Sequence, residues 1–307
     1  MVGEPLQILR GHTLRKATSL VPLDTPTCTN VTRVHAVQHI RRMRGGAQSH
    51  LMRCSDGNCY VVKFQNNPQH VRVLTNELLA SLLARQVGLS VLEPTLVFVS
   101  PWLVEHTLEL TIDYLHESVP CQPGLHFGSR FVLSRPWDGQ VMDFFPVTML
   151  PKVRNLSELW GMLLFDKWTG NSDSRQAVYW RNMRQKYYTA TFIDHGYCFN
   201  AGEWAFPDTP LGGTYFHTAA YQQVTGWESF EPWLSRIESL SPELVRLAGA
   251  QIPREWLGGS TAELDWLVHR ILERRSNVRT LVTAFRDSMR KPFPNWGKEV
   301  ESNRATA

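Results

Sequence analysis

The sequence has few cysteines, and no two of them have metal-binding spacing. Its five cysteines are scattered over 307 residues without a Cys-x-x-Cys motif. An odd, dispersed set does not make a disulfide framework, and a zinc ribbon needs closely spaced thiolates. The eleven histidines likewise lack the His-Glu-x-x-His spacing of a zinc-binding helix. We therefore expect neither a disulfide scaffold nor a zinc site, and a reducing, cytoplasmic compartment fits best.

Long hydrophobic runs are also absent. The most apolar stretches, residues 95–104 and 156–165, are interrupted by Ser, Pro or charge. Each is about half the roughly 20 residues that a membrane-spanning helix needs. Glu4 and Pro5 stand where a signal peptide carries positive charge, and no apolar segment follows them. We therefore expect a soluble protein that is not exported and has no membrane partner.

The chain carries no strong excess of charge of either sign. Lys and Arg number 32 and Asp and Glu 28, which gives a formal net charge of +4. This balance is compatible with an anionic ligand and does not require nucleic acid. Basic residues at 41–53 and 270–279 could bind nucleic acid, but the charge balance of residues 251–300 is typical of solvated helix faces, so nucleic acid is not the expected partner, although the composition leaves it open.

The first half of the chain alternates predicted strands with one helix. Apolar runs on both sides of Asp56 and Gly57 predict a β-hairpin over residues 51–64. Leucines at helical spacing then predict a helix with Thr75 as its N-cap and Gly88 as its stop. Residues 94–104 and 130–134 are typical of further strands. This half is therefore mixed, with mostly antiparallel strands.

Helical periodicity dominates the second half. Trp160, Leu163, Leu164 and Trp168 form the stripe of a buried helix. Residues 177–180 and 188–193 predict one strand pair, and a capping box at 260–263 and an apolar stripe at 278–285 predict a C-terminal helical layer. The aromatic stretch 203–227 fits core packing best, with a wall of an acceptor site as the alternative. We predict an α+β fold with domains 1–136 and 137–307, divided near Pro136.

Three features of the first half suit a phosphate ligand. Gly45 and Gly46 precede a predicted strand, where glycines can present backbone N–H groups, although an ordinary turn is the simpler interpretation. Lys63 lies among apolar residues in a predicted strand, where it is either an edge lysine or a phosphate ligand. A buried ammonium needs a partner, and Glu77 on the following helix can supply one. This order of parts is typical of a kinase nucleotide site.

Two aspartates in the second half suit the same chemistry. Asp173 lies in the polar loop 170–176 between a helix and a strand, and Asp194 closes a strongly apolar strand before Gly196. A carboxylate in such a place is costly unless it binds a cation or accepts hydrogen bonds. Two carboxylates at the ends of a strand pair can flank one transferred phosphoryl group.

Taken together, these motifs resemble the HipA-like kinases, specifically a short single-chain branch without the N-terminal extension of the toxin members. The resemblance runs from about Val34 to Phe293 through GGAQSH, YVVK, NELLA, LHFGSRF, GNSD and IDHG. It implies a bilobal protein-kinase-like fold, with an N-terminal antiparallel sheet lobe that carries one helix and a mostly helical C-terminal lobe. It also implies the cofactors ATP and Mg²⁺ and phosphoryl transfer to Ser or Thr hydroxyls of a protein acceptor, with autophosphorylation at Ser49 as a further hypothesis.

The resemblance assigns roles to individual residues. Asp173 would accept the proton of the attacking hydroxyl, Asp194 would hold Mg²⁺, and Lys63, fixed by Glu77, would contact phosphate. The residues implied in covering the phosphates are Gly45, Gly46, Ala47, Gln48 and Ser49. The residues implied around adenine at the hinge are Phe131, Val132 and Leu133, within the segment 130–134.

One position departs from the family pattern. Val178 stands five residues after Asp173, where the family has an asparagine for a second metal, and a valine cannot bind a hard cation. Gln176 or Asn171 could supply the missing oxygen, whereas Asp166 lies in a helical stripe and is predicted to be structural. The alternatives are a pseudokinase that binds nucleotide and signals by shape, or a kinase for a small molecule or lipid.

Overall fold

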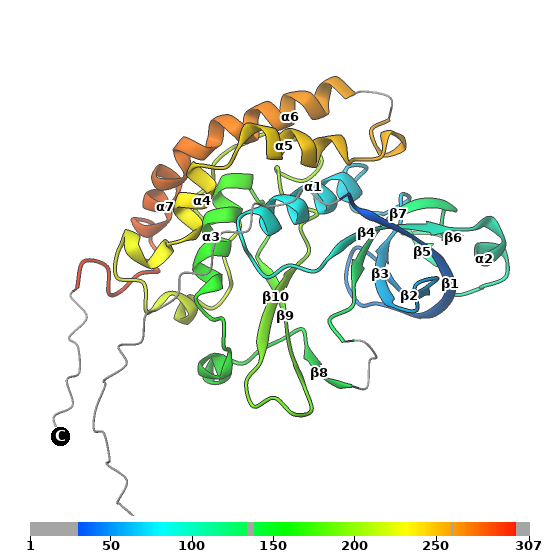
Figure 1. The fold of residues 1–307 in the computed structure, drawn as a ribbon, viewed down its shortest axis with the longest axis horizontal. Helices are drawn as coiled ribbons and strands as arrows, with labels where there is room; N and C mark the ends of the chain where they lie inside the picture. Colours follow the sequence, from blue (N-terminus) through cyan, green and yellow to red (C-terminus); the bar gives the residue numbers. More distant parts are fainter. Residues whose placement is uncertain (1–29, 134–137, 259–260, 299–307) are drawn as a thin grey trace, which may run out of the picture.

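The computed structural model describes residues 30–133, 138–258 and 261–298 (Figure 1). The predicted boundary at Pro136 and the first residue of the predicted capping box, Ser260, lie outside these described residues. The described part divides into a strand-rich region that comes first and a helical region that follows, which agrees with the predicted α+β class. Within this part, no helix is long and apolar enough to cross a membrane.

Five strands of the first region close into a barrel. They are β1 (Thr32–Arg42), β2 (His50–Cys54), β3 (Cys59–Lys63), β4 (Pro94–Val99) and β7 (Gly124–Arg130), in the order β1-β2-β3-β7-β4. Side chains alternate along these strands, and Met52, Val62 and Val97 are completely buried inside. The sheet is antiparallel except where β1 runs parallel to β4, so the predicted antiparallel lobe is only partly correct. Closure also removes an exposed sheet edge.

The predicted hairpin of the barrel is confirmed, and three predicted boundaries are wrong. β2 and β3 pair around Gly57, whose φ of +80° suits glycine. Helix α1 (Val73–Gln86) begins two residues before Thr75, which is fully buried and does not cap it. β4 ends at Val99, because Ser100 caps the short helix α2 (Pro101–Glu105) through Leu103 N. The predicted strand 130–134 is shifted, since β7 ends at Arg130.

A second, three-stranded sheet lies below the barrel's edge in Figure 1. It consists of β8 (Gly139–Met142), β9 (Gln176–Asn182) and β10 (Thr189–Ile193), in the order β10-β9-β8. The β9–β10 pair matches the predicted strand pair, and β8 was not predicted. A separate small hairpin joins β5 (Thr111–Asp113) to β6 (Ser118–Pro120). The short helix η1 (Val147–Lys152) connects β8 to the next helix.

The helical region packs around α3 (Glu158–Thr169), whose Leu163, Leu164 and Trp168 are buried as predicted. It also contains α4 (Trp233–Glu238), α5 (Pro242–Ala250), α6 (Thr261–Arg274) and α7 (Val278–Arg286). Helix α1 lies under α5 and belongs to the same hydrophobic core as these helices (Figure 1). The barrel has its own smaller core. The partner of Lys63 on α1 is therefore anchored in the helical core, while Lys63 itself belongs to the barrel.

Candidate active site

A cavity of about 460 Å³ lies where the barrel meets the β9–β10 pair. Most of the residues singled out from the sequence line it. Those that do are Gly45, Gly46, Ala47, Ser49, Lys63, Glu77, Phe131, Val132, Asp173, Gln176 and Asp194. Those that do not are Gln48, Leu133 and Asn171. Residues more than 100 positions apart in the sequence thus converge on one cavity, which is the candidate active site.

Lys63 is the electrostatic centre of this cavity. Its ammonium forms an ion pair with Glu77 of α1 and donates a hydrogen bond to Asp194 Oδ1 at 2.8 Å. The same Glu77 oxygen accepts a hydrogen bond of 3.0 Å from Gly196 N, just past Asp194. Lys63 is only 8% exposed and Glu77 2% exposed. The predicted lysine–glutamate partnership is therefore present, and Asp194 joins it.

Burial and charge act against each other on these groups. Burial alone would lower the pKa of Lys63, but the carboxylates of Glu77 and Asp194 raise it above its ordinary value. Burial also raises the pKa of Glu77, and the Lys63 ammonium opposes this. For Asp194, burial is outweighed by Lys63 and Arg175, which hold its pKa down at about 2. Asp194 is therefore an anion at neutral pH and is suited to bind a cation.

The glycine-containing loop covers one side of the cavity. Gly45 has a φ of +114°, and Gln48, at +47°, is also left-handed. Hydrogen bonds from Met43 N to Ser49 O (2.8 Å) and from Gln48 N to Gly45 O (3.1 Å) close the loop. The Gln48 side chain lies away from the cavity, since it bonds to Arg42 and to the backbone of Asp113. Gln48 is thus placed to shape the loop rather than to touch a ligand.

Asp173 stands at the exposed side of the cavity. The loop turns sharply at Gly170, which has a φ of +60°. Asn171 follows it and is buried, and its side-chain oxygen accepts a hydrogen bond of 3.1 Å from Asp173 N. The amide nitrogen of Asn171 donates to Asp166 at 3.0 Å, so both ends of this side chain are engaged inside the chain. Asn171 therefore positions the backbone of Asp173.

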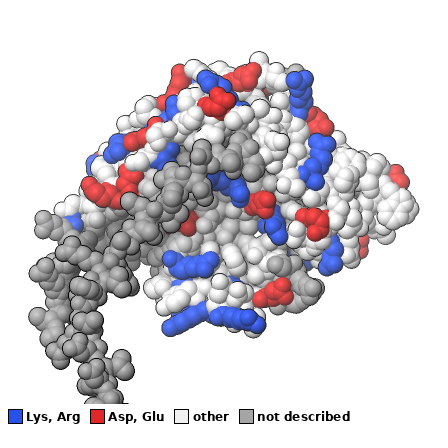
Figure 2. All heavy atoms as spheres, in the orientation of Figure 1, with Lys and Arg blue, Asp and Glu red and all other residues white. Residues whose placement is uncertain are grey.

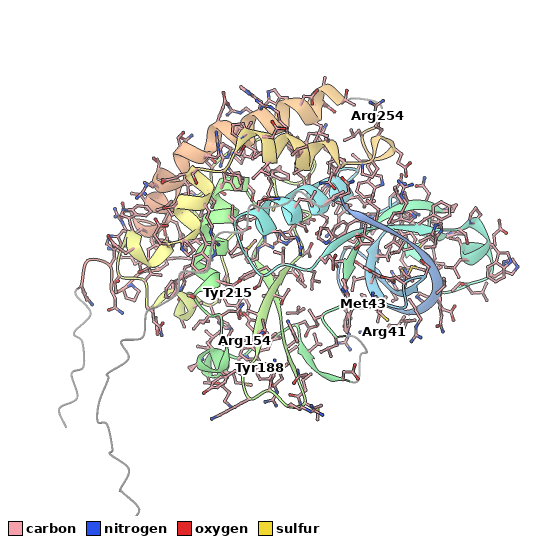
Figure 3. The ribbon with its side chains drawn as sticks, viewed as in Figure 1. Arg41, Met43, Arg154, Tyr188, Tyr215 and Arg254 are labelled. Carbon is pink, nitrogen blue, oxygen red and sulfur yellow. The ribbon has the colours of Figure 1, made fainter. Side chains whose placement is uncertain are left out.

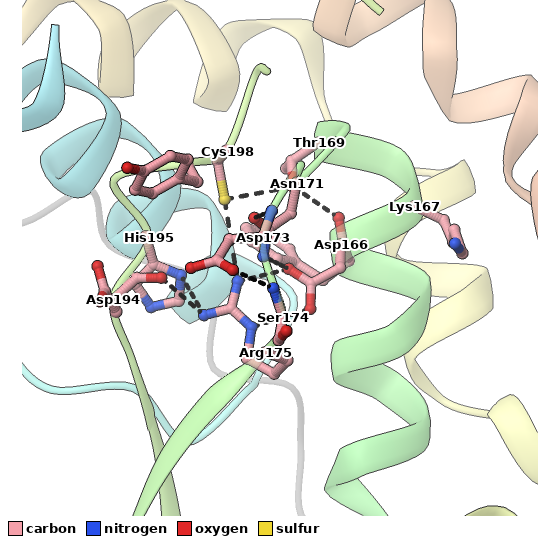
Figure 4. A network of polar contacts seen from close by, with 12 residues as sticks. Asp166, Lys167, Thr169, Asn171, Asp173, Ser174, Arg175, Asp194, His195 and Cys198 are labelled. Atoms are coloured by element: carbon pink, nitrogen blue, oxygen red, sulfur yellow. Dashed lines mark hydrogen bonds and ion pairs between the residues drawn. The ribbon is translucent and has the colours of Figure 1, made fainter. Parts of the chain in front are cut away.

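A buried ion pair that the sequence did not reveal supports this loop. Arg175 donates to both carboxylate oxygens of Asp166, and both side chains are almost completely buried (Figure 4). The other side of the guanidinium donates to the carbonyls of Ile193 (2.7 Å) and Asp194 (3.2 Å). Arg175 thus joins the Asp173 loop to the Asp194 strand end. Asp166 is structural, as predicted. The sequence feature that could have indicated its partner is the arginine at position 175, two residues after Asp173.

Gln176 and Val178 occupy different parts of the cavity. Both project from the same face of β9, two residues apart. The Gln176 amide lies 3.0 Å from Asp194 Oδ2. Val178 instead lines the apolar part of the cavity, together with Val61, Leu92, Phe127 and Phe192. This apolar part has the character of a site for a flat aromatic ring, and the polar part lies at the other end of the strand pair.

The donor set around Asp194 fits a magnesium ion. Within the described residues, no three His, Cys, Asp or Glu side chains group as a metal cluster. Mg²⁺, however, is usually held by one or two carboxylates together with substrate phosphates and waters. Asp194, Asp173 and the amide of Gln176 all line the cavity and supply hard oxygen donors. The residues present are thus compatible with a metal that arrives with a phosphate ligand.

The aromatic segment 203–227 packs mainly in the core, as predicted. Trp204, Tyr215 and Tyr221 are buried. Phe216 is 47% exposed and stacks on Phe144 with 6.1 Å between ring centroids. Just before it, Gly213 N donates to the Asp173 carbonyl at 3.0 Å. The segment therefore holds the backbone of the Asp173 loop as well as filling the core.

Comparisons with known proteins give a consistent result. A family model described as HipA-like kinase matches residues 36–279. The fold is similar to the proinflammatory kinase CtkA of Helicobacter pylori, at 12% identity and a TM-score of 0.51, over 84% of this chain and 99% of that chain. At this identity the similarity shows the fold alone, and that fold is kinase-like. No curated protein matches the sequence.

Two further solved structures resemble the chain more distantly. The Golgi casein kinase with Mn/ADP bound matches at 13% identity and a TM-score of 0.49, over 85% of this chain and 74% of that chain. HipA of the Shewanella oneidensis MR-1 toxin–antitoxin system matches at 11% identity and a TM-score of 0.45, over 82% of this chain and 68% of that chain.

Proposed function

Because the chain belongs to the HipA-like kinase family, we propose that it transfers the γ-phosphoryl group of ATP to a Ser or Thr hydroxyl of a protein acceptor, with Mg²⁺. The observation that carries the proposal is the convergence of Lys63, Asp173 and Asp194 on one cavity. Lys63 and Asp194 are in hydrogen-bond contact there, and the exposed Asp173 stands beside them. Kinase catalysis consists largely of positioning and charge stabilisation, which these three groups provide.

The polarity of the cavity supports one orientation of the nucleotide. In this proposal, adenine lies against the apolar side chains around Val178 and Phe192, beside Phe131 and Val132 of the segment after β7. The phosphates then lie toward Lys63, under the backbone of the glycine-containing loop. The nucleotide then lies between the two predicted lobes, whose proposed bounds are 1–136 and 137–307. Leu133 lines a neighbouring hollow instead, so its contribution to the adenine site is indirect.

Asp194 is the proposed main metal ligand, and Gln176 is the proposed replacement for the asparagine that the family has at the position of Val178. When bound, the metal supplies positive charge against the β- and γ-phosphates. Gln176 reaches the second oxygen of Asp194, whereas Asn171 is engaged with Asp166 and lies outside the cavity. Rotation of the Gln176 amide turns its oxygen toward the place of a cation.

Asp173 is the proposed catalytic residue. Its exposed carboxylate orients the acceptor hydroxyl and accepts its proton as the oxygen attacks the γ-phosphorus. Ser49 is a proposed site of autophosphorylation, because it lies in the phosphate-covering loop and lines the cavity. It is 6% exposed, so the loop has to open before its hydroxyl can react. A phosphate there would repel the nucleotide phosphates.

One observation favours a second candidate function. Val178 removes the usual second metal ligand, which is the change expected in a pseudokinase that binds nucleotide without turnover. A kinase transfers the γ-phosphoryl group to an acceptor, whereas a pseudokinase does not. Radiolabelled γ-phosphate from ATP should reach protein acceptors in an extract only with Mg²⁺ and the wild-type chain, and Asp194→Asn should abolish it. Nucleotide binding without any turnover of ATP would establish the pseudokinase instead.

A further inference from the structure

Five basic side chains gather at the end of the second sheet that lies farthest from Asp194. We call this surface the basic face; it consists of Lys152, Arg154, Arg181, Arg184 and Lys186. They come from the end of η1, from β9 and from the turn between β9 and β10. Figure 2 shows Lys and Arg side chains along the lower edge of the molecule, where this hairpin lies. These five charges exceed the formal net charge of +4 for the whole chain.

The cations of the basic face are not neutralised by carboxylates. Some arginines elsewhere are, as in the pairs Arg72–Glu263, Arg130–Glu93 and Arg279–Glu238. None of the five cations of the basic face forms an ion pair with any residue that the structure describes. Four of them are exposed, and Arg181 is half-buried. Unpaired cations held close together attract an anionic partner.

The backbone under the basic face is fixed. Tyr188 N donates to Lys152 O and Arg154 N donates to Tyr188 O, both at 2.9 Å, which ties the segment at the end of η1 to the residue that precedes β10. Arg181 donates two hydrogen bonds to Gln140 of β8, at 3.0 and 2.9 Å, and its guanidinium lies 4.7 Å from the centre of the Tyr188 ring. The backbone that carries these charges and the Arg181 side chain are therefore held in place before any partner binds, which reduces the entropy lost on binding.

Three neighbouring hollows link the candidate active site to the basic face through shared lining residues. Arg41, Phe131 and Val141 line both the nucleotide cavity and a neighbouring hollow of about 590 Å³. Met149 and Tyr188 line both that hollow and a third one of about 210 Å³, whose walls include Lys152, Arg181 and Lys186. Figure 3 shows Arg41 on the barrel side, and Arg154 with Tyr188 on the hairpin side. A peptide that follows these three hollows can thus touch both the active site and the basic face.

We propose that the basic face docks an acidic segment of the protein acceptor, so that the acceptor is held while its hydroxyl is at the active site. This inference rests on the proposed kinase function. A protein segment is the occupant that follows from the proposed function, because the hollows beside the basic face share lining residues with the cavity where the acceptor hydroxyl would react. Specific nucleic-acid interfaces bury on the order of 1,000 Å² or more of positively charged surface, whereas the basic face consists of five side chains at one end of one sheet.

The test measures binding of a fluorescent octaglutamate peptide in the absence of nucleotide, so it does not depend on turnover. We expect binding by the wild-type chain that weakens as the salt concentration rises, and no binding of octaglutamine. Arg184→Glu with Lys186→Glu should weaken octaglutamate binding at least about tenfold, which corresponds to 1.4 kcal/mol. ATP hydrolysis should be unchanged. If the charge reversal impairs folding, Arg184→Gln with Lys186→Gln replaces it, and this variant should also weaken octaglutamate binding.

A matched control makes the same change of charge elsewhere. Arg246 and Arg254 are exposed, and Figure 3 shows Arg254 at the opposite end of the molecule from Tyr188. Their replacement by Glu should leave peptide binding unchanged. Equal loss in the control, equal binding of octaglutamine, or tighter binding of an oligothymidylate than of octaglutamate would overturn the proposal. Absence of ATP turnover by the wild-type chain would contradict the kinase function, but it would not change the result of the peptide-binding measurement.

The link to the acceptor needs one further measurement. Excess octaglutamate should reduce label transfer from ATP to proteins of an extract, while octaglutamine should not, and ATP hydrolysis should not change. Transfer that is insensitive to the acidic peptide would show that the basic face does not hold the acceptor.

Discussion

Lys63 of β3 donates a hydrogen bond of 2.8 Å to Asp194 Oδ1, although 131 positions separate them in the sequence. The contact joins the barrel to the end of β10, and Glu77 completes it from α1. It occupies one oxygen of Asp194 and leaves the other facing Gln176. Because the second oxygen faces Gln176, we expect Gln176 to supply the metal ligand that Val178 cannot.

Gln176→Leu should raise the Mg²⁺ concentration needed for half-maximal phosphoryl transfer by about tenfold or more, because ligand-shell losses typically cost 10- to 100-fold. The substitution removes the amide that faces Asp194 and keeps the size of the side chain. Gln176→Glu, which restores an oxygen donor, should recover much of the metal affinity. Unchanged magnesium dependence in Gln176→Leu would show that Gln176 plays no part in metal binding.

The Asp166–Arg175 pair should be essential for stability. Arg175→Met leaves the Asp166 carboxylate buried without its partner, which typically costs about 3–5 kcal/mol. Denaturant unfolding at neutral pH measures the loss. Asp166→Asn combined with Arg175→Met should recover part of it, since the unpaired charge is then gone. A loss below about 1 kcal/mol in the single variant would contradict the assigned role.

The pH dependence of stability should include a contribution from His126. This side chain is fully buried, and burial lowers its pKa to about 4. Because the folded-state pKa lies below the ordinary value, the folded state favours the neutral ring. The resulting stability is present above about pH 6.5 and is lost as the pH falls toward 4, by at most about 3 kcal/mol.

Urea unfolding at pH 7 and pH 5 tests this contribution. His126→Asn retains an acceptor for the Gln65 N–H and should lose less stability between the two pH values than the wild type does. His116→Asn, at an exposed position between β5 and β6, should behave like the wild type. Identical pH profiles for wild type and His126→Asn would contradict the prediction.

Ser49 should acquire one phosphoryl group when the purified chain is incubated with MgATP, as measured by intact mass. Ser49→Ala should remove the added mass, and the phosphorylated wild type should bind nucleotide more weakly because of charge repulsion. Ser55→Ala, at the exposed hairpin turn, is the control and should keep the modification. Persistence of the added mass in Ser49→Ala would place the modification elsewhere.

Local sequence patterns predicted the residues of the candidate site that lie on regular secondary structure. An apolar strand around Lys63, leucines at helical spacing around Glu77, and a carboxylate at the end of an apolar strand each leave a local signal. Barrel closure by the parallel pairing of β1 with β4 leaves no local signal, because the pairing joins residues about 60 positions apart. The same holds for β8, a short strand defined by its partner β9 rather than by its own four residues.

Side-chain partners were the least predictable part of the site. Asn171 has the right chemistry for a metal ligand, but the turn at Gly170 directs it toward Asp166. Gln48 lies within the phosphate-covering motif, but its positive φ and its bonds to Arg42 and Asp113 keep it outside the cavity. In both cases the residue type indicated the chemistry, but the backbone conformation decided where the side chain points.

Phosphoryl transfer by the wild type and by Asp173→Asn, with nucleotide binding measured on the same samples, tests the central claim most directly. Asp173 is exposed, so the substitution should leave folding and MgATP binding intact. It should lower transfer by about 100- to 10,000-fold, the range typical of a lost general base, whereas the neighbouring Ser174→Ala should be nearly as active as the wild type. Transfer at wild-type rate in Asp173→Asn would contradict the assignment of this cavity as a kinase active site.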